Sequence, residues 1–316
     1  MMDYLRNLWD ILQRKGHRLL AVYLAINAIF ATWILGSFMT GIVGHPIIGW
    51  ILGFLLYILS LCIALSPIGE AYLRWKSGSR KIIRLDDISF LEPIFERVSK
   101  GARELNPNIP NDVSLFIETS KYPNALATGR KTICLTRGLL QYPPRVVEAV
   151  VAHEYGHLAH KDTDLLLLVT VGNLVVNVFF FILWLYAKLF KGICTILGAV
   201  AGHSLDERGN DGSTAGRGLG ELIGNGVVLV FHTLPWMAWT KLGEICVLRA
   251  GRNNEYKADE FAFNLGYGHE LCQFFDDLEE DGDSNKGFFA LLQKTHPPKD
   301  DRIAKLQELG ATYRNV

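Results

Sequence analysis

The sequence predicts a mainly α-helical membrane protein, in which four transmembrane helices are combined with a mixed α/β soluble domain. Three observations lead to this prediction. The chain has 316 residues, and the 51 residues 19–69 contain no Asp, Glu, Lys or Arg. Two further segments of low charge lie in the second half, and charged segments with helix-like and strand-like patterns alternate with them. Since a spanning helix needs about 20 apolar residues, the first run alone is long enough for two.

The overall composition excludes several other classes of protein. The chain has 32 Lys and Arg against 32 Asp and Glu, so its formal net charge is zero. A nucleic-acid-binding protein needs a basic excess to neutralise phosphates, and we therefore expect no nucleic acid partner. The long uncharged run excludes a purely soluble chain and a disordered one. The 5 cysteines have no paired spacing, which indicates structural thiols rather than a disulfide framework.

The uncharged run predicts a transmembrane hairpin over residues 19–66. A Gly-His-Pro sequence at residues 44–46 is typical of a turn and divides the run into spans at residues 19–40 and 47–66. A cleaved signal peptide is the alternative for the first span. The apolar part of a signal peptide has only about 7–15 residues, and no small-residue cleavage site is visible here, so the spanning interpretation is favoured.

A second pair of spans, with its connection, is predicted within residues 164–248. Residues 165–187 are uncharged and long enough for the third span. The fourth span is placed at residues 227–247, although this stretch contains a proline and two charged residues. The connecting segment, residues 188–226, contains a glycine-rich part at 206–220. A glycine-rich sequence of this kind is typical of a mobile loop.

Basic residues near the span ends predict the orientation in the membrane. Lys and Arg are frequent in residues 1–18 and directly after the second span, and the turn between the first two spans has none. Both flanks of the hairpin are therefore expected on the cytoplasmic side. An even number of spans places residues 67–163 and 249–316 on that side as well. Lys188 and Lys191, beyond the third span, argue mildly against this orientation.

The segment before the third span has a mixed α and β pattern. Residues 86–105 have a helix-like composition, with one proline near the first turns. Residues 113–118 and 132–136 are short apolar runs rich in β-branched side chains, which is typical of strands. Pro144 predicts the start of a further helix, because proline suits the first helical position.

The sequence His153-Glu154-Tyr155-Gly156-His157 lies on the helix that begins near Pro144. Residues four apart on a helix share a face, so both histidines can point a ring nitrogen at one metal ion. Glu154 lies beside the first of them and can reach a water bound to that ion. Zinc lowers the pKa of such a water towards about 7, and a carboxylate can then take its proton for attack on a carbonyl. The alternative is a pair of surface histidines on an amphipathic helix.

A catalytic zinc ion needs a third protein ligand, and residues 253–262 offer one. This segment is helix-like and places Glu255 and Asp259 one turn apart on one face. Glu255 can bind the ion, and Asp259 can accept the second N–H of a ligand histidine. Taken alone, the segment fits a solvated charged face better. Topology favours the metal site, because each motif lies about eight residues from a span, roughly 12 Å along a helix, on the same side of the membrane.

In this combination the chain resembles the HtpX-type membrane metallopeptidases, which are relatives of the zinc CAAX prenyl proteases. The resemblance rests on four segments in the same order: HEYGH at 153–157 with Asp162, NEYKAD at 254–259, NALATG at 124–129, and THPP at 295–298 with Arg302-Ile303. HExxH alone is shared by many zinc peptidases, but the ordered set is specific. Four spans resemble the HtpX arrangement better than that of the longer, seven-span prenyl proteases.

The resemblance implies a gluzincin-type zinc protease domain, made of residues 67–163 with the HExxH helix and residues 249–316 with the glutamate ligand. It implies one Zn²⁺ ion per chain, held by three ligands: His153, His157 and Glu255. Glu154 is then the general base, and Asp259 supports a ligand histidine.

Two further groups are implied beside the metal. His296 and Arg302 are expected to donate to the oxyanion that forms during attack on a peptide bond, although a histidine before two prolines is otherwise typical of a loop. The family's segment beside the cleft corresponds to four residues here: Asn124, Ala125, Ala127 and Gly129. Such a segment can pair with an extended substrate as an added strand. The alternative is a plain turn between two strands.

The expected function is a membrane zinc endopeptidase that cleaves membrane or misfolded proteins at the cytoplasmic face of a bacterial inner membrane. Its expected partners are protein or peptide substrates and the lipid bilayer. Two alternatives come from other classes. One is a sensor-transducer protease with one specific regulator as its substrate, and the other is a non-catalytic scaffold with a structural metal site. The intact Glu154 argues against the scaffold, because a structural site has no use for a base.

Overall fold

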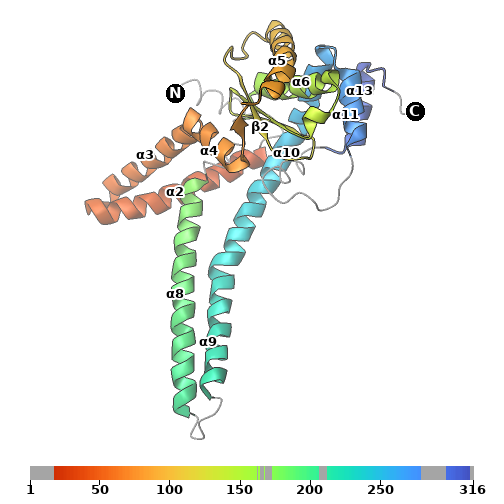
Figure 1. The fold of residues 1–316 in the computed structure, drawn as a ribbon. Coiled ribbons are helices and arrows are strands. Elements are labelled where there is room, and N and C mark those ends of the chain that lie inside the picture. The colour runs from red at the N-terminus through yellow and green to blue at the C-terminus, as the bar shows by residue number, and fades with distance from the viewer. Residues whose placement is uncertain are drawn as a thin grey trace. The chain divides into compact units, whose positions relative to one another are not determined.

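The computed structural model describes residues 18–161, 163, 167, 173–205, 212–278 and 297–313 (Figure 1). The chain divides into two compact units. The first, here called the sheet unit, consists of Met1–Val22, Leu59–Gly172 and Cys246–Val316. The second, here called the helical unit, consists of Tyr23–Ile58 and Asn173–Ile245. Each unit is described by itself.

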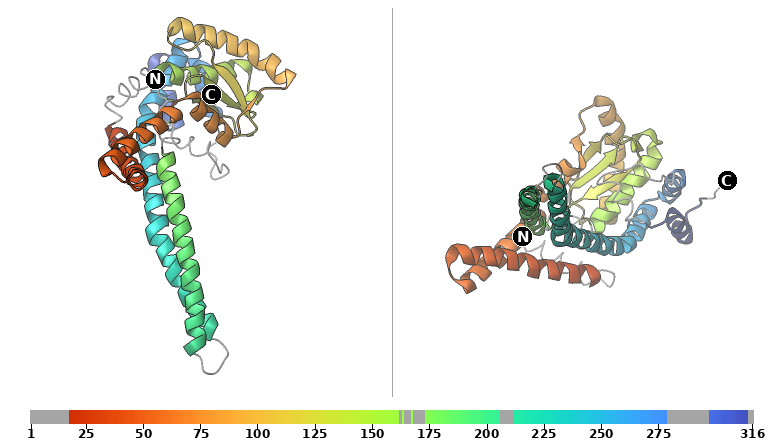
Figure 2. Two further views of the ribbon diagram at one scale, coloured as in Figure 1. Left: turned by 90° about the vertical axis from the view of Figure 1, so that its left-hand side faces the viewer. Right: turned by 90° about the horizontal axis from the view of Figure 1, so that it is seen from below.

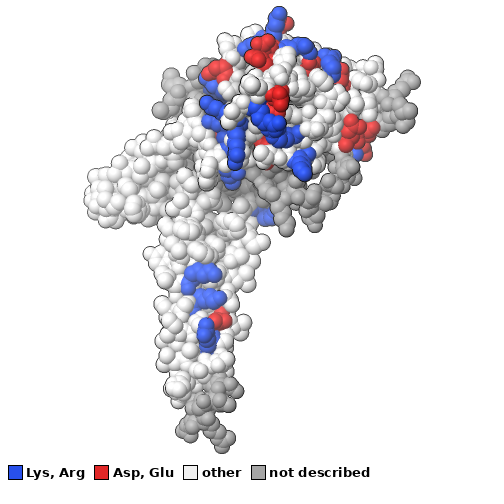
Figure 3. Space-filling model, viewed as in Figure 1, with Lys and Arg blue, Asp and Glu red and all other residues white. Residues whose placement is uncertain are grey.

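The helical unit contains the long apolar helices, and the prediction of four membrane helices is confirmed. The candidate spans are Arg18–Val43, Pro46–Ala64, Leu174–Ser204 and Ser213–Gly243. The first two are helices α2 (Arg18–Val43) and α3 (Pro46–Ala64), with the predicted turn between them. In the view of Figure 3 the surface of these two helices shows no Lys, Arg, Asp or Glu. A surface of this kind is compatible with lipid and not with water.

The prediction of a mobile glycine-rich loop is wrong over most of its length. Helix α8 (Leu174–Leu205) continues beyond the expected third span, and helix α9 (Gly212–Val228) begins within the expected loop. The two helices run side by side (Figure 2) because glycines let their backbones touch. A Cβ atom on Gly216 would lie 2.0 Å from the carbonyl oxygen of Gly198, and one on Gly220 would lie 2.1 Å from that of Cys194. The glycines thus serve close helix packing, as in other membrane helix pairs, rather than flexibility.

The proline in the fourth span does not end the helix. A π-helical turn (Leu229–Thr233) follows α9 directly, and helix α10 (Leu234–Asn264) follows that turn and contains Pro235. Proline has no N–H to donate, and a wider turn before it is a common way for a helix to continue. The fourth span therefore begins earlier than predicted, at Ser213, and α10 continues as far as Asn264.

The sheet unit contains a four-stranded sheet with strand order β1-β2-β4-β3. Its strands are β1 (Arg80–Lys81), β2 (Ser114–Glu118), β3 (Ala125–Thr128) and β4 (Thr132–Thr136). The two strands predicted from the sequence, β2 and β4, are confirmed, and they pair in parallel. β3 pairs antiparallel with β4 and is an outer strand of the described sheet. The NALATG segment therefore contains a strand, and the alternative of a plain turn between two strands is excluded.

The helices of the sheet unit surround a central buried helix, α6 (Pro144–His160). It starts at the predicted proline, and the side chains of Val147, Ala149 and Val151 are fully buried. The predicted helix before β2 is α5 (Leu85–Leu105). The described part of the unit also contains α4 (Pro67–Ser77), α11 (Gly268–Asp277), α13 (Lys299–Leu309) and the end of α10 from Cys246. Because α6 is buried on nearly all sides, any polar side chain on it must find a partner inside the protein.

The packing of α8 against α9 predicts opposite effects for two glycines on one helix. Gly216→Ala is expected to lower the free energy of unfolding by about 1–3 kcal/mol, because its methyl group meets backbone atoms of α8. The matched control is Gly218→Ala, where a Cβ atom meets nothing within 4 Å and helix propensity favours alanine. Thermal unfolding of the full chain in detergent measures both. Equal melting temperatures for the two variants would contradict the close helix pair.

Candidate metal centre

Helix α6 places the HExxH residues inside the protein. His153 is 4% exposed and Glu154 is 5% exposed, and His157 is partly buried. The alternative of two surface histidines on an amphipathic helix is therefore excluded. The four-residue spacing brings the two rings together, with their Nε2 atoms 3.1 Å apart. Two imidazoles facing each other in a buried site need either a shared proton or a cation between them.

The third member of the group comes from α10. Gly156 on α6 allows the approach, because a Cβ atom there would lie only 2.7 Å from the Cα of Ala258 on α10. Glu255, one turn before Ala258, then reaches both histidines. One of its carboxylate oxygens lies 3.5 Å from Nε2 of His153, and the other lies 3.5 Å from Nε2 of His157.

The geometry of His153, His157 and Glu255 fits a tetrahedral metal ion. One ligand atom from each residue lies within 4.8 Å of the others. Zinc bonds to nitrogen and oxygen are about 2.0–2.2 Å long, so tetrahedral ligand atoms lie about 3.3–3.5 Å apart. The 3.1 Å between the two Nε2 atoms is near this spacing, and each Nε2 atom lies 3.5 Å from a different carboxylate oxygen of Glu255. A set of two imidazoles and one carboxylate suits zinc, and it leaves a fourth position for water.

Asp259 lies behind His153, as expected. Its Oδ1 is 2.9 Å from Nδ1 of His153, which directs Nε2 of that ring toward the metal position. Asp259 is 1% exposed. Burial by itself raises the pKa of this carboxyl, but the charge and hydrogen bonds of Arg302 outweigh it and lower the pKa below its ordinary value. The buried carboxylate is therefore ionised and can orient the histidine.

Arg302, on α13, binds Asp259 with two hydrogen bonds. Its Nε donates to Oδ2 at 2.8 Å, and its Nη2 donates to Oδ1 at 2.6 Å. The guanidinium carbon lies 3.9 Å from the centre of the Phe275 ring, and Nη2 is 3.4 Å from Oε2 of Glu255. Burial lowers the pKa of Arg302, yet the nearby carboxylates raise it by more, so the group stays charged. These contacts favour a positioning role over the expected donation to an oxyanion.

The protonation of His153 is set by the same neighbours. Burial lowers the pKa of the ring, whereas hydrogen bonds to Asp259 and Glu255 raise it by more, and the pKa ends above its ordinary value. A metal ion bound at Nε2 must displace the proton from that atom. Metal binding is therefore coupled to proton release at this site.

Glu154 is not part of the ligand group and faces the outer strand β3. Its Oε2 accepts a hydrogen bond from the backbone N–H of Ala127 at 2.5 Å. Asn124 accepts a hydrogen bond from the backbone N–H of Thr136, so in the antiparallel ladder the backbone groups of Leu126 face β4 and those of Ala125 and Ala127 point away from it. The strand thus presents an edge to the same space that Glu154 faces. Gly129 lies just beyond β3, in the turn to β4, with a φ angle of 59°.

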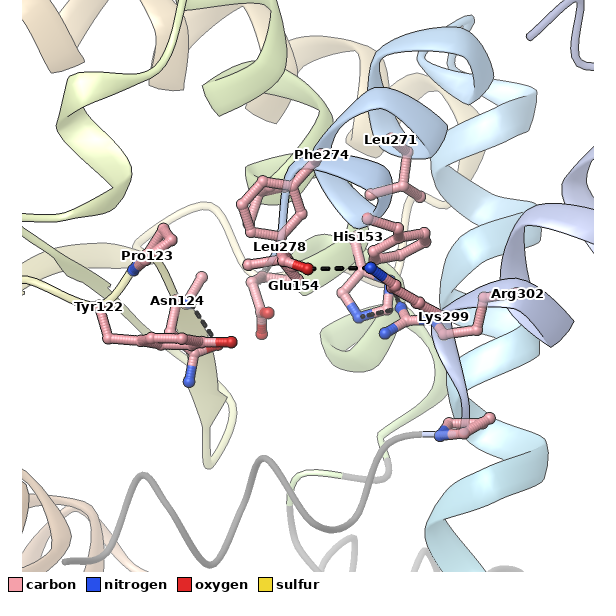
Figure 4. A pocket seen from close by; sticks show the side chains of 14 residues that line it. Tyr122, Pro123, Asn124, His153, Glu154, Leu271, Phe274, Leu278, Lys299 and Arg302 are labelled. Carbon is pink, nitrogen blue, oxygen red and sulfur yellow. Dashed lines mark hydrogen bonds between the residues drawn. The ribbon is translucent and has the colours of Figure 1, made fainter. Parts of the chain in front are cut away.

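A cleft of about 190 Å³ opens beside Glu154 (Figure 4). Its lining includes residues 122–125 before and within β3, His153 and Glu154 on α6, and Arg302 on α13. Val150, Pro297 and the charged Lys299 also line it. The rest of the lining is an apolar wall on α11 and its end: Leu271, Phe274, Phe275 and Leu278. This wall was not predicted. Its spacing of i, i+3, i+4 and i+7 was visible in the sequence, but the same spacing is typical of an ordinary helix core.

Most of the expected site residues come together in the structure. Asn124 and Ala125 line the cleft, and Ala127 contacts Glu154. His296 lies outside the described residues. The adjoining Pro297 lines the cleft.

The hydrogen bond between Asp259 and His153 predicts a role in metal affinity. Asp259→Asn removes the charge that orients the histidine, and zinc affinity is expected to fall about 10–100-fold. Competition with a chromophoric chelator measures the affinity. Glu260→Gln, at the next and exposed position of α10, is the control and is expected to bind zinc like the unmodified protein. An unchanged affinity in Asp259→Asn would contradict the proposed support.

Comparison with known proteins finds relatives along most of the chain. The chain is 28% identical to a protease HtpX homolog of Janthinobacterium sp. (strain Marseille) over 278 residues, which cover 82% of this chain and 84% of the relative. It is 25% identical to a protease HtpX homolog of Methanocaldococcus jannaschii over 283 residues, covering 80% of this chain and 88% of the relative. The crystal structure of S. mikatae Ste24p aligns with 96% of this chain and 66% of that chain, at 18% identity and a TM-score of 0.40.

The match at family level covers the whole candidate site. Residues 91–310, which are more than half of the chain, match peptidase family M48. This segment includes α6, the end of α10, α11 and α13, so every described residue of the metal centre lies within it. The chain therefore belongs to peptidase family M48 and is an HtpX-like membrane metalloprotease.

Proposed function

We propose that this metalloprotease hydrolyses peptide bonds with one zinc ion held by His153, His157 and Glu255 and with Glu154 as the general base. The observation that carries the proposal is the His–His–Glu group together with a fourth residue, Glu154, whose carboxylate is not in that group and lines an open cleft. When bound, zinc acts as a Lewis acid and lowers the pKa of a coordinated water to about 7.

Glu154 is oriented for proton transfer by one fixed hydrogen bond. Its Oε2 is held by the N–H of Ala127, and Oε1 makes no hydrogen bond to the described residues. The free oxygen can accept a proton from the attacking water and later deliver it to the leaving amine. Glu154 and His153 line the same cleft, and Glu154 is not a member of the candidate ligand group.

The substrate is proposed to bind as an extended strand along the outer edge of β3. The backbone carbonyl groups of Ala125 and Ala127 point away from β4 and can accept hydrogen bonds from a peptide backbone, independent of its sequence. The N–H of Ala127 is bound to Glu154, and the N–H of Ala125 is bound to Oδ1 of Asn124. The apolar wall on α11 can receive a large apolar side chain next to the cleaved bond. The cleft thus supports an endopeptidase that recognises an extended peptide backbone and, in addition, one large apolar side chain.

The proposed setting is a bacterial inner membrane, with the active site on its cytoplasmic side. The charge pattern around the first hairpin supports this orientation. Both soluble segments, residues 67–163 and 249–316, lie within the sheet unit, which supports one protease domain built from two parts of the chain. Glu255 lies on α10, which continues from the fourth span ending at Gly243, so membrane proteins and misfolded proteins near the bilayer are the proposed substrates in a quality-control role.

Replacement of the base tests the proposed chemistry. Glu154→Gln is expected to lower kcat about 10²–10⁴-fold, because the amide cannot take a proton from water. Cleavage of casein and of the chain itself, started by adding zinc to chelator-treated protein, measures the rate. Zinc content of the variant, which is expected to be unchanged, serves as the control. Full activity in Glu154→Gln would show that the carboxylate is not the base and would favour a different mechanism or a scaffold.

The apolar wall predicts a preference for large apolar side chains. Phe274→Ala is expected to lower kcat/KM about 10-fold for peptides with Leu or Phe next to the cleaved bond, since lost apolar contacts of this size cost about 1–3 kcal/mol. For matched peptides with Ala at that position, the variant and the unmodified enzyme are expected to be similar. An equal loss for both peptide series would show that Phe274 does not select side chains.

A further inference from the structure

Helix α4 makes a sharp corner with the end of membrane helix α3. Two residues separate the helices, and the Oγ of Ser66 caps the start of α4 by accepting a hydrogen bond from the N–H of Ile68 at 3.2 Å. A Cβ atom on Gly69 would lie 1.8 Å from the carbonyl oxygen of Ala64, so the corner is tightly packed. The end of α3, from Leu59, and all of α4 belong to the sheet unit. Residues that pack against α4 are therefore held in a fixed position relative to the end of α3.

Glu70 on α4 is buried against the turn that joins β3 to β4. It is 8% exposed. Its Oε1 accepts a hydrogen bond from the backbone N–H of Arg130 at 2.9 Å, and its Oε2 accepts one from Oγ1 of Thr132 at 3.0 Å. Arg74, one turn later on α4, donates to the same Thr132 hydroxyl at 3.0 Å and lies 3.7 Å from Oε2 of Glu70. The Glu70 carboxylate thus accepts hydrogen bonds from both a backbone N–H and a side-chain hydroxyl at the β3–β4 turn.

The space around Gly129 in the β3–β4 turn is too small for any side chain. Gly129 has a φ angle of 59°, which favours glycine, and a Cβ atom there would lie 2.2 Å from Oε1 of Glu70. On the opposite side, the hydroxyl of Thr163 donates to the carbonyl oxygen of Gly129. The glycine is therefore enclosed between a buried carboxylate and a hydroxyl.

The held turn lies two residues from the contact between β3 and the catalytic base. Ala127 donates its N–H to Glu154, and Gly129 is the second residue after it. β3 pairs with one neighbour, β4, in the described sheet, so its position depends strongly on how its ends are held. The other end is tied by Asn124, whose N–H donates to Oγ1 of Thr136 at 2.8 Å.

We propose that Glu70 is a positioning residue that holds the substrate-binding edge strand β3 in place relative to Glu154. The proposal rests on the proposed function, since it assigns the edge of β3 to substrate. Glu70 does not touch the reacting atoms, and it acts through the backbone of the β3–β4 turn. Because α4 follows α3 directly, the same contact links the substrate edge to the end of the membrane hairpin.

Three variants of the full chain in detergent test the proposal. Glu70→Ala removes the acceptor, Thr132→Val removes one donor while keeping the side-chain shape, and Glu70→Gln keeps an acceptor for Arg130. Glu92→Ala, at an exposed position of α5, is the control. Amide hydrogen exchange across residues 125–131 is expected to be at least 5-fold faster in Glu70→Ala and Thr132→Val, with α5 unchanged. Unchanged exchange in both variants overturns the proposal.

Peptide kinetics separate positioning from a loss of folded enzyme. For extended peptides, KM is expected to rise about 10-fold in Glu70→Ala, with kcat within 2-fold and with zinc content unchanged, and Glu70→Gln is expected to recover part of the KM. A lower kcat with unchanged KM would indicate fewer folded molecules and would overturn the positioning role. If the unmodified chain cleaves no peptide, the proposed function fails, whereas the exchange experiment still decides whether Glu70 holds the strand.

Discussion

Helices α6 and α10 approach each other so closely at Gly156 that a Cβ atom there would lie 2.7 Å from the Cα of Ala258. The metal centre depends on this contact. The two histidines come from α6 and the glutamate comes from α10, and ligand distances of 3.1–3.5 Å tolerate little separation of the helices. A metal site tolerates errors of only a few tenths of an ångström, so the glycine within the HEYGH segment is as much a part of the site as its ligands.

Burial of charge is the second constraint. His153, Glu255, Asp259 and Arg302 are each at most 5% exposed. Removing such groups from water is costly unless every charge is paired and hydrogen-bonded, and breaking one pair leaves the others uncompensated. Arg302 neutralises Asp259, and a bound cation would neutralise Glu255 between the two histidines. The buried network therefore orients the ligands, while a metal ion completes the charge balance that the protein begins.

The open side of the site is built differently. An outer strand, β3, presents one edge beside Glu154, where the N–H of Ala127 binds the carboxylate, and such an edge needs support because only one neighbouring strand holds it in the described sheet. Support comes from the β3–β4 turn, where Glu70 and Thr163 enclose Gly129. This arrangement suits catalysis on extended peptides. The metal centre is rigid and β3 is held at its ends, so the geometry of the β3 backbone is set before the substrate binds.

The sequence by itself determined the four membrane helices, strands β2 and β4 and the start of α6 at Pro144, because these follow from local patterns: apolar length, β-branched runs and proline at a helix start. It also predicted His153, His157 and Glu255 as metal ligands, and the folded chain brings these three side chains together. Tertiary structure alone decided the rest. Gly216 and Gly220 belong to a segment that looked flexible in sequence but pack against α8, Arg302 binds Asp259, and Glu70 reaches a turn about 60 residues away along the chain. The physical reason is the same in each case: the partner is distant in sequence, and burial, which decides what a polar or small residue does, is a property of the folded chain.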